Sequence, residues 1–193
     1  MKKIIKDALI LFAITFVAGL LLALVNEVTK TPIAEAAARQ KEEACKMVFE
    51  EASAFEQVDN INNVISESNS KVTIREVYTA KNSNNEVIGY VFNILTKEGY
   101  GGDISFVMGV DNSRKLNGIS VLSSSETVGL GLEADKVLAP QFKNKTVDVF
   151  TYTKTGSAND SEIDAISSAT ITTNAYVNAV NAGLAYFDII SNQ

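Results

Sequence analysis

The chain has 193 residues, a formal net charge of −6 and no histidine. The acidic balance argues against nucleic acid as a partner, because phosphate backbones bind to basic surfaces. Without histidine, Ser-His-Asp chemistry, imidazole general bases and histidine-ligated metals are excluded, and we assign no catalytic residue and no metal site. The one cysteine, Cys45, cannot form a disulfide within the chain, and we expect it to be a small hydrophobic residue in a helix.

An uninterrupted apolar stretch at residues 8–25, ALILFAITFVAGLLLALV, predicts a membrane-spanning helix. As a helix it would cover about 27 Å, close to the hydrocarbon thickness of a bilayer. Lys2, Lys3 and Lys6 precede it, so the positive-inside rule places the N-terminus in the cytoplasm and the rest of the chain outside. The alternative is a signal peptide cleaved near AEAAA (34–38), but the apolar stretch is long for a signal and polar NEVTKTP follows it.

Helices are predicted on both sides of a strand-rich region. Thr31 and Pro32 suit the N-cap and first position of a helix that continues to about residue 55. Residues 56–70 are polar and predict a loop. Apolar residues at helical spacing predict a final helix over residues 174–190.

Five strands are predicted between these helices, at residues 72–80, 87–95, 105–111, 116–123 and 146–152. The fold class is therefore α+β, with an N-terminal transmembrane helix and an extracytoplasmic domain that has an antiparallel sheet and flanking helices. We divide the chain into the cytoplasmic N-terminus and anchor (1–28), a helical connector (29–70) and the outer domain (71–193).

A cluster of hydroxyl side chains, DAISSATITT at residues 164–173, precedes the final helix. Thr172 or Thr173 suits the N-cap position, and the first turn of a helix offers N–H groups and a partial positive charge that bind phosphate. Spacing alone leaves two interpretations open. The segment is either an ordinary capped helix start or an anion site in which a threonine hydroxyl lies beside a phosphate.

DAISSAT at residues 164–170 resembles the flavinylation motif Asp-x-x-Ser/Thr-Gly-Ala-Thr of a family of FMN-binding domains. This domain occurs in the G subunit of the Rnf complexes and in the C subunit of the Na⁺-pumping NADH:quinone reductases. The last threonine of the motif, which carries FMN through a phosphoester bond in the family, falls on Thr170. Asp164, Ser167 and Ala169 also match, and Ser168 stands where the family has glycine.

Two more segments carry the resemblance. SSSETVGLGLEADK (123–136) resembles the family's Glu-Thr-Pro-Gly-Leu-Gly loop, which lies against the isoalloxazine ring. Val128 replaces its proline, and Ser124 stands where histidine is frequent. EGYGGDISFVMGVD (98–111) resembles the family's Gly-Tyr-Gly-Gly segment at the start of a strand. Alone, each segment is also what an ordinary glycine-containing turn would show. The short chain with one anchor favours the Rnf G subunit over the longer protein of the quinone reductases.

The resemblance implies a covalent FMN that relays electrons outside the membrane and needs no acid–base residue. Rnf complexes couple electron transfer between ferredoxin and NAD⁺ to Na⁺ or H⁺ transport. The expected partners are the other Rnf subunits, especially the integral membrane subunits and the second flavinylated subunit, and an FAD-dependent flavin transferase. Asp164 is expected to serve recognition of the motif or activation of the hydroxyl. The expected cofactor contacts are Glu126, Thr127, Gly129, Leu130, Gly131, Ser167, Ser168, Ala169, Thr172 and Thr173.

Two further alternatives stay open from the sequence. A free-standing flavinylated protein that delivers electrons to extracellular acceptors would share every residue named above. A surface binding module without a cofactor would explain the anchor and the acidic domain, but not the two motifs together.

Overall fold

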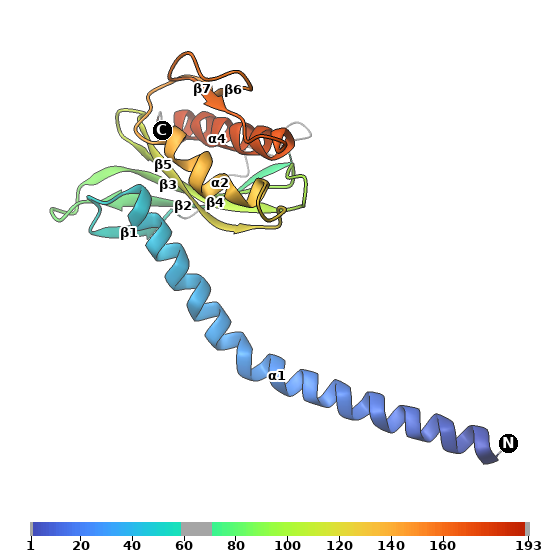
Figure 1. Ribbon diagram of the computed structural model, residues 1–193. Helices are drawn as coiled ribbons and strands as arrows, with labels where there is room; N and C mark the ends of the chain where they lie inside the picture. The colour runs from blue at the N-terminus through green and yellow to red at the C-terminus, as the bar shows by residue number, and fades with distance from the viewer. Residues whose placement is uncertain (1, 59–70, 192–193) are drawn as a thin grey trace. The chain divides into compact units, whose positions relative to one another are not determined.

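Figure 1 shows the computed structural model, which describes residues 2–58 and 71–191. The chain forms two compact units, Met1–Gln40 and Lys41–Gln193. A long apolar N-terminal helix is followed by an antiparallel sheet with further helices, which confirms the predicted α+β class. Most of the loop predicted at residues 56–70 lies outside the described residues.

Helix α1 runs without interruption from Lys2 to Val48. The expectation of a new helix at Thr31 and Pro32, ending near residue 55, is wrong at both ends. Pro32 lies inside α1, where it removes one backbone donor at a cost of about 3 kcal/mol. The helix continues because strong helix formers lie on both sides of the proline, and each of them adds a backbone hydrogen bond.

The apolar part of α1 has the length and composition of a membrane-spanning helix. Its most apolar 18-residue window has a mean hydropathy of 2.9, and none of that window is buried within the structure. The hydroxyl of Thr15 donates to the carbonyl of Leu11 at 3.0 Å, so this polar group is satisfied inside the helix. An exposed surface of this kind is consistent with the predicted membrane anchor.

The second unit is built on a five-stranded antiparallel sheet in the order β1-β2-β3-β4-β5. The strands are β1 (Ala54–Gln57), β2 (Val72–Lys81), β3 (Val87–Thr96), β4 (Ile104–Asp111) and β5 (Leu116–Ser124). The four strands predicted between residues 72 and 123 are confirmed. Strand β1 was not predicted, because its short segment lies where we expected the end of a helix and a loop.

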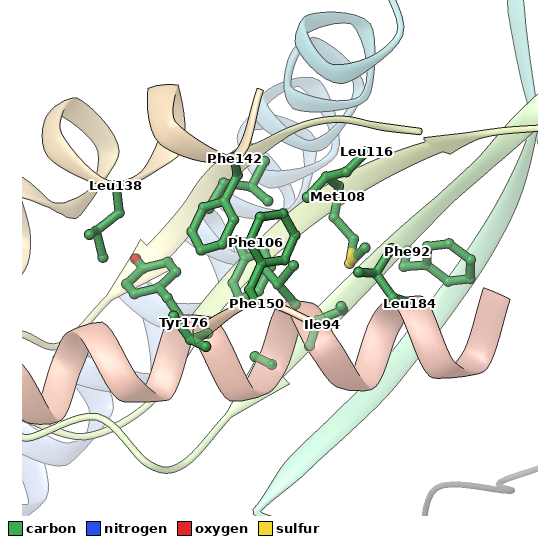
Figure 2. Packing of buried hydrophobic residues seen from close by; sticks show 14 of the residues in the cluster. Phe92, Ile94, Phe106, Met108, Leu116, Leu138, Phe142, Phe150, Tyr176 and Leu184 are labelled. Atoms are coloured by element: carbon green, nitrogen blue, oxygen red, sulfur yellow. The ribbon is translucent and has the colours of Figure 1, made fainter. Parts of the chain in front are cut away.

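The main core lies between one face of this sheet and helix α4, Thr170–Ile190. Phe92 of β3 and Phe106 of β4 point toward the helix, and Tyr176 and Leu184 of α4 meet them (Figure 2). The ring centroids of Phe106 and Tyr176 are 5.4 Å apart. Each large apolar side chain buried here contributes roughly 1.5–3 kcal/mol, so the helix is firmly fixed on the sheet.

The opposite face of the sheet packs against the last turns of α1, within the second unit. Successive strand residues alternate between the two faces, so Val107 of β4 points away from α4. It packs in a smaller apolar cluster with Ala44, Cys45, Val48, Phe49, Ala80 and Val91. The ion pair between Lys41 Nζ and Glu76 Oε2, at 3.1 Å, lies beside this cluster. Cys45 is buried in a helix, as predicted.

The strand predicted at residues 146–152 is largely wrong. Only its last two residues belong to a strand, β6 (Thr151–Thr153), which pairs in parallel with β7 (Glu162–Asp164) in a separate two-stranded sheet. Phe150 is buried in the core, and its backbone N–H and C=O both bond to the side chain of Asn181 at 2.8 Å. The side chain of Asn181 in α4 therefore makes the hydrogen bonds to Phe150 that the backbone of a neighbouring strand would otherwise make.

Three short helical segments connect β5 to the β6 region (Figure 1). They are η2 (Gly131–Glu133), α2 (Ala134–Val137) and α3 (Ala139–Phe142). Phe142 at the end of α3 packs its ring edge-on against Phe150, with centroids 5.0 Å apart. This contact ties the connection to the main core.

Candidate functional site

A cavity of about 370 Å³ lies beside the first turn of α4. Three segments far apart in the sequence form it: the loop before β4, the loop after β5 and the start of α4. The lining residues are Tyr100, Glu126, Thr127, Leu130, Gly131, Ser168, Ala169, Thr170, Ile171 and Thr172. The volume is typical of small-molecule sites, which span roughly 300–1,000 Å³. The fold thus brings together the three segments that the sequence singled out.

The carboxylate of Glu126 joins the first two segments. Its Oε1 accepts a hydrogen bond from the N–H of Tyr100 at 2.8 Å, and its Oε2 accepts one from the N–H of Gly101 at 3.2 Å. A Cβ on Gly131 would lie 2.8 Å from Glu126 Oε2 and 2.8 Å from Thr172 Oγ1. Glycine at this position therefore lets the loop after β5 approach the first turn of α4.

Helix α4 begins at Thr170, with Ala169 as its N-cap. The expectation that Thr172 or Thr173 caps the helix is wrong, because both threonines are buried inside it. No side chain of the described residues makes a capping hydrogen bond at Ala169. The N–H groups of the first turn therefore point out with a partial positive charge, an arrangement that binds anions such as phosphate.

Ser168 holds its backbone in the left-handed region, with φ at 63°. This conformation costs a residue with a Cβ about 1–2 kcal/mol and costs glycine almost nothing. The flavinylation motif that DAISSAT resembles has glycine at this position. Glycine suits this position because the chain must turn here to enter α4. Ser168 makes the same turn with backbone strain.

Two family models match this chain, the FMN-binding domain over residues 99–185 and the RnfG N-terminal region over residues 1–48. The chain is 35% identical over 199 residues to the G subunit of the Na⁺-translocating ferredoxin:NAD⁺ oxidoreductase complex of Acetobacterium woodii, covering 98% of this chain and 94% of that protein. The chain belongs to the family of Rnf G subunits.

Further Rnf G subunits match over most of their length. The G subunit of the ion-translocating oxidoreductase complex of Methanosarcina acetivorans is 31% identical, over 96% of this chain and 95% of that protein. The G subunit of the proton-translocating ferredoxin:NAD⁺ oxidoreductase complex of Clostridium ljungdahlii is 30% identical, over 91% and 90%. Among solved structures, NqrC of Shewanella oneidensis matches with a TM-score of 0.49 and 16% identity, over 69% of this chain and 65% of that one.

Most of the contact residues predicted for this Rnf G subunit lie together. Those in the cavity lining are Glu126, Thr127, Leu130, Gly131, Ser168, Ala169, Thr170 and Thr172. Gly129, Ser167 and Thr173 lie outside the lining. Gly129 forms a turn with φ at 78°, and Ser167 is exposed. Thr173 is fully buried, and its hydroxyl is bonded to the backbone.

Asp164, the acidic residue of the DAISSAT segment, ends strand β7 outside the cavity lining. Its backbone is held by Gln141, whose Oε1 accepts from the N–H at 2.7 Å and whose Nε2 donates to the carbonyl at 3.2 Å. Its Oδ2 accepts from Ser157 Oγ at 3.4 Å. Its Oδ1 is buried and has no hydrogen-bond partner among the described residues. The backbone of Asp164 is therefore held by two hydrogen bonds, while its side-chain Oδ1 accepts none from the described residues.

Two lining residues were not predicted, Tyr100 and Ile171. Tyr100 lies in the GYGG segment, which the sequence singled out without giving its tyrosine a role. Ile171 is 54% exposed, in a helix whose buried face includes Thr172, Thr173 and Tyr176. An apolar residue on the outer face of a first helical turn is the signal that could have identified it.

The phenol of Tyr176, in α4, is fully buried. Its hydroxyl has no hydrogen-bond partner within the described part of the chain. Burial, and then the nearby carboxylates of Asp135 and Glu126, raise the pKa of Tyr176 far above its usual value. The phenol therefore stays protonated at neutral pH.

Proposed function

We propose that this Rnf G subunit carries FMN as a phosphoester on Thr170 and relays electrons within a membrane-bound Rnf complex. The observation that carries the proposal is the start of α4. Thr170 is the first residue of the helix, it lines the cavity, and the helix has no side-chain cap among the described residues. The N–H groups of this turn would hold the phosphate, and the Thr170 hydroxyl lies next to them.

Accessibility separates Thr170 from three of the neighbouring hydroxyls. Thr172 and Thr173 are 1% and 0% exposed, so an enzyme acting from outside cannot reach them. Ser167 is exposed but lies outside the cavity lining. Thr170 and Ser168 meet both requirements, since each is exposed at least in part and lines the cavity. Of the two, only Thr170 lies in the first turn of α4, where the N–H groups would hold the phosphate.

The cavity walls suit a flat ring with a phosphate at one end. Leu130, Ile171 and Tyr100 offer apolar or aromatic surface, and the close-packed Gly131 keeps the loop after β5 near the helix. FMN, when bound, supplies electron transfer in one- or two-electron steps. The walls would hold the ring in place.

Attachment requires a second protein, which we propose to be an FAD-dependent flavin transferase. In that step Thr170 Oγ1 would lose its proton and form the bond to phosphorus, and AMP would leave from FAD. Asp164 would serve recognition of the segment or activation of the hydroxyl. Its buried Oδ1, without a partner among the described residues, supports a role outside the fold's own hydrogen bonding.

We also propose the placement of the chain in the complex. Residues 1–28 would form the cytoplasmic N-terminus and single membrane span, residues 29–70 a connector, and residues 71–193 an FMN domain outside the membrane. Lys2, Lys3 and Lys6 before the apolar stretch support this orientation. The domain would exchange electrons with the other Rnf subunits, in particular the integral membrane subunits and a second flavinylated subunit, between ferredoxin and NAD⁺. Na⁺ or H⁺ transport would be coupled to this transfer.

The test is covalent attachment. The full chain is co-expressed with a flavin transferase, denatured and run on a gel under ultraviolet light, and the labelled peptide is mapped by mass spectrometry. We expect a fluorescent band with FMN on Thr170, its loss in Thr170→Ala, and its retention in Ser167→Ala, which removes an exposed hydroxyl three residues away. Stoichiometric covalent FMN in Thr170→Ala would refute the assignment.

A further inference from the structure

We propose that the buried carboxylate of Glu126 lowers the reduction potential of the flavin in the cavity. This inference rests on the proposed function, since it takes FMN as the occupant. Glu126 lines the cavity and is 7% exposed. No Lys or Arg in the described part of the chain forms an ion pair with it. Its negative charge is therefore not neutralised by a neighbouring side chain.

Two backbone N–H groups hold the carboxylate of Glu126 in place. The N–H groups of Tyr100 and Gly101 donate to its two oxygens at 2.8 and 3.2 Å. Hydrogen bonds donated to a carboxylate are stronger than those donated to a neutral acceptor, so its two oxygens are firmly positioned. The backbone N–H groups carry only partial charges, so the site keeps a net negative charge.

Reduction adds electrons to the flavin and oxidises its donor, and the carboxylate opposes this gain of negative charge. The opposition is strong in a cavity because the surrounding protein screens charge much less than water does. Glu133, seven residues further along, provides the contrast. It pairs with Lys136 at 3.0 Å and its side chain is 36% exposed, so solvent and the cation screen its charge.

Two variants of Glu126 are needed, because Glu126→Gln removes the charge and also one of the two oxygens that accept backbone N–H bonds. Glu126→Gln keeps the size and one acceptor oxygen but removes the charge. Glu126→Asp keeps the charge and shortens the side chain by one methylene. Glu133→Gln removes the same charge from a screened position and serves as the matched control.

The full chain is co-expressed with a flavin transferase and purified in detergent, and the midpoint potential is measured by redox titration after covalent loading is confirmed. We expect a more positive potential in Glu126→Gln and potentials close to wild type in Glu126→Asp and Glu133→Gln. An unchanged potential in Glu126→Gln, or an equal shift in Glu133→Gln, would overturn the inference. Absence of flavin from the wild-type chain would instead overturn the proposed function.

If Glu126→Gln takes up no flavin, a second measurement tests whether the Glu126 carboxylate interacts with the flavin. Glu126 is the one buried glutamate in the described part of the chain. Reduced-minus-oxidised infrared spectra of the Glu133→Gln protein are recorded with and without ¹³C-labelled glutamate. A carboxylate band that moves on labelling shows that a glutamate senses the redox change, as the inference requires. A spectrum without such a band overturns it.

Discussion

The hydroxyl of Thr173 accepts a hydrogen bond from the N–H of Ile166 at 3.1 Å and donates one to the carbonyl of Ala169 at 3.0 Å. Both bonds are buried. Ile166 precedes the strained turn at Ser168, and Thr173 lies in the first turns of α4. One hydroxyl therefore holds both sides of the turn that presents Thr170 to the cavity.

Replacing Thr173 by valine should destabilise the folded unit by about 1–3 kcal/mol, because the Ile166 N–H then stays buried without an acceptor. Thr173→Ser keeps the hydroxyl and loses only one methyl group, so its loss should be near 0.8 kcal/mol, about the value of one buried CH₂ group. Urea unfolding of the full chain in mild detergent, followed by circular dichroism, measures both. Equal stability of the valine variant and wild type would show that the hydroxyl does not hold the turn.

Ser168→Gly should stabilise the protein by about 1 kcal/mol, because glycine adopts the left-handed conformation without a Cβ penalty. Ser167→Gly is the matched control, since Ser167 is a neighbouring exposed serine outside the left-handed region. It should bring no gain, because glycine there only increases the freedom of the unfolded chain. The midpoint of thermal unfolding compares the two. A gain at residue 167 rather than 168 would contradict the strain argument.

The thiol of Cys45 should be unreactive in the folded protein. Burial raises the pKa of Cys45 to about 11. The thiolate is the reactive form, and an unfolded cysteine has a pKa near 8.5, so alkylation at pH 8 should be slower in the folded state by about a hundredfold or more. Iodoacetamide labelling followed by mass spectrometry measures the rate, with the protein in 8 M urea as the control. Rapid labelling without denaturant would show that the end of α1 detaches readily from the sheet.

The ion pair between Arg114 and Asp188 should make stability depend on pH. Arg114 Nε lies 2.7 Å from Asp188 Oδ1, and the hydrogen bond lowers the pKa of Asp188 below its usual value. A carboxyl whose pKa is lowered by folding stabilises the folded state above its unfolded pKa, and this contribution is lost as the pH falls through the folded pKa. The side chain of Asp188 is 44% exposed, so solvent screening limits the effect.

We therefore expect Asp188→Asn to lower the free energy of unfolding by about 0.5–1 kcal/mol at pH 7. The difference from wild type should shrink as the pH falls below about 4, where the wild-type carboxyl becomes protonated. Urea unfolding of both proteins at pH 7 and pH 3 measures this. A difference that is unchanged at pH 3 would assign the loss to packing rather than charge.

Local sequence patterns were sufficient to predict the elements whose composition suits only one kind of structure or surroundings. The strands around Phe92 and Phe106 are rich in β-branched and aromatic residues and are buried along most of their length, so their bounds could be predicted from the sequence. The apolar stretch before residue 25 stands out for the same reason, since its composition suits only one environment. The motif resemblance selected three segments around Tyr100, Glu126 and Thr170 without showing how they meet.

The sequence by itself determined the membrane helix, the central strands and the segments of the site, because each is encoded by near neighbours in the chain. Tertiary structure decided where α4 begins, what Phe150 bonds to and which hydroxyls of DAISSATITT line the cavity. Each of these depends on a partner distant in sequence or on a strained turn. The side chain of Asn181 bonds to the backbone of Phe150, and Glu126 accepts from the N–H of Tyr100, 26 residues earlier, beside the paired ends of β4 and β5. Hydrogen bonds between such distant groups form only once packing has brought them together, so no local pattern predicts them.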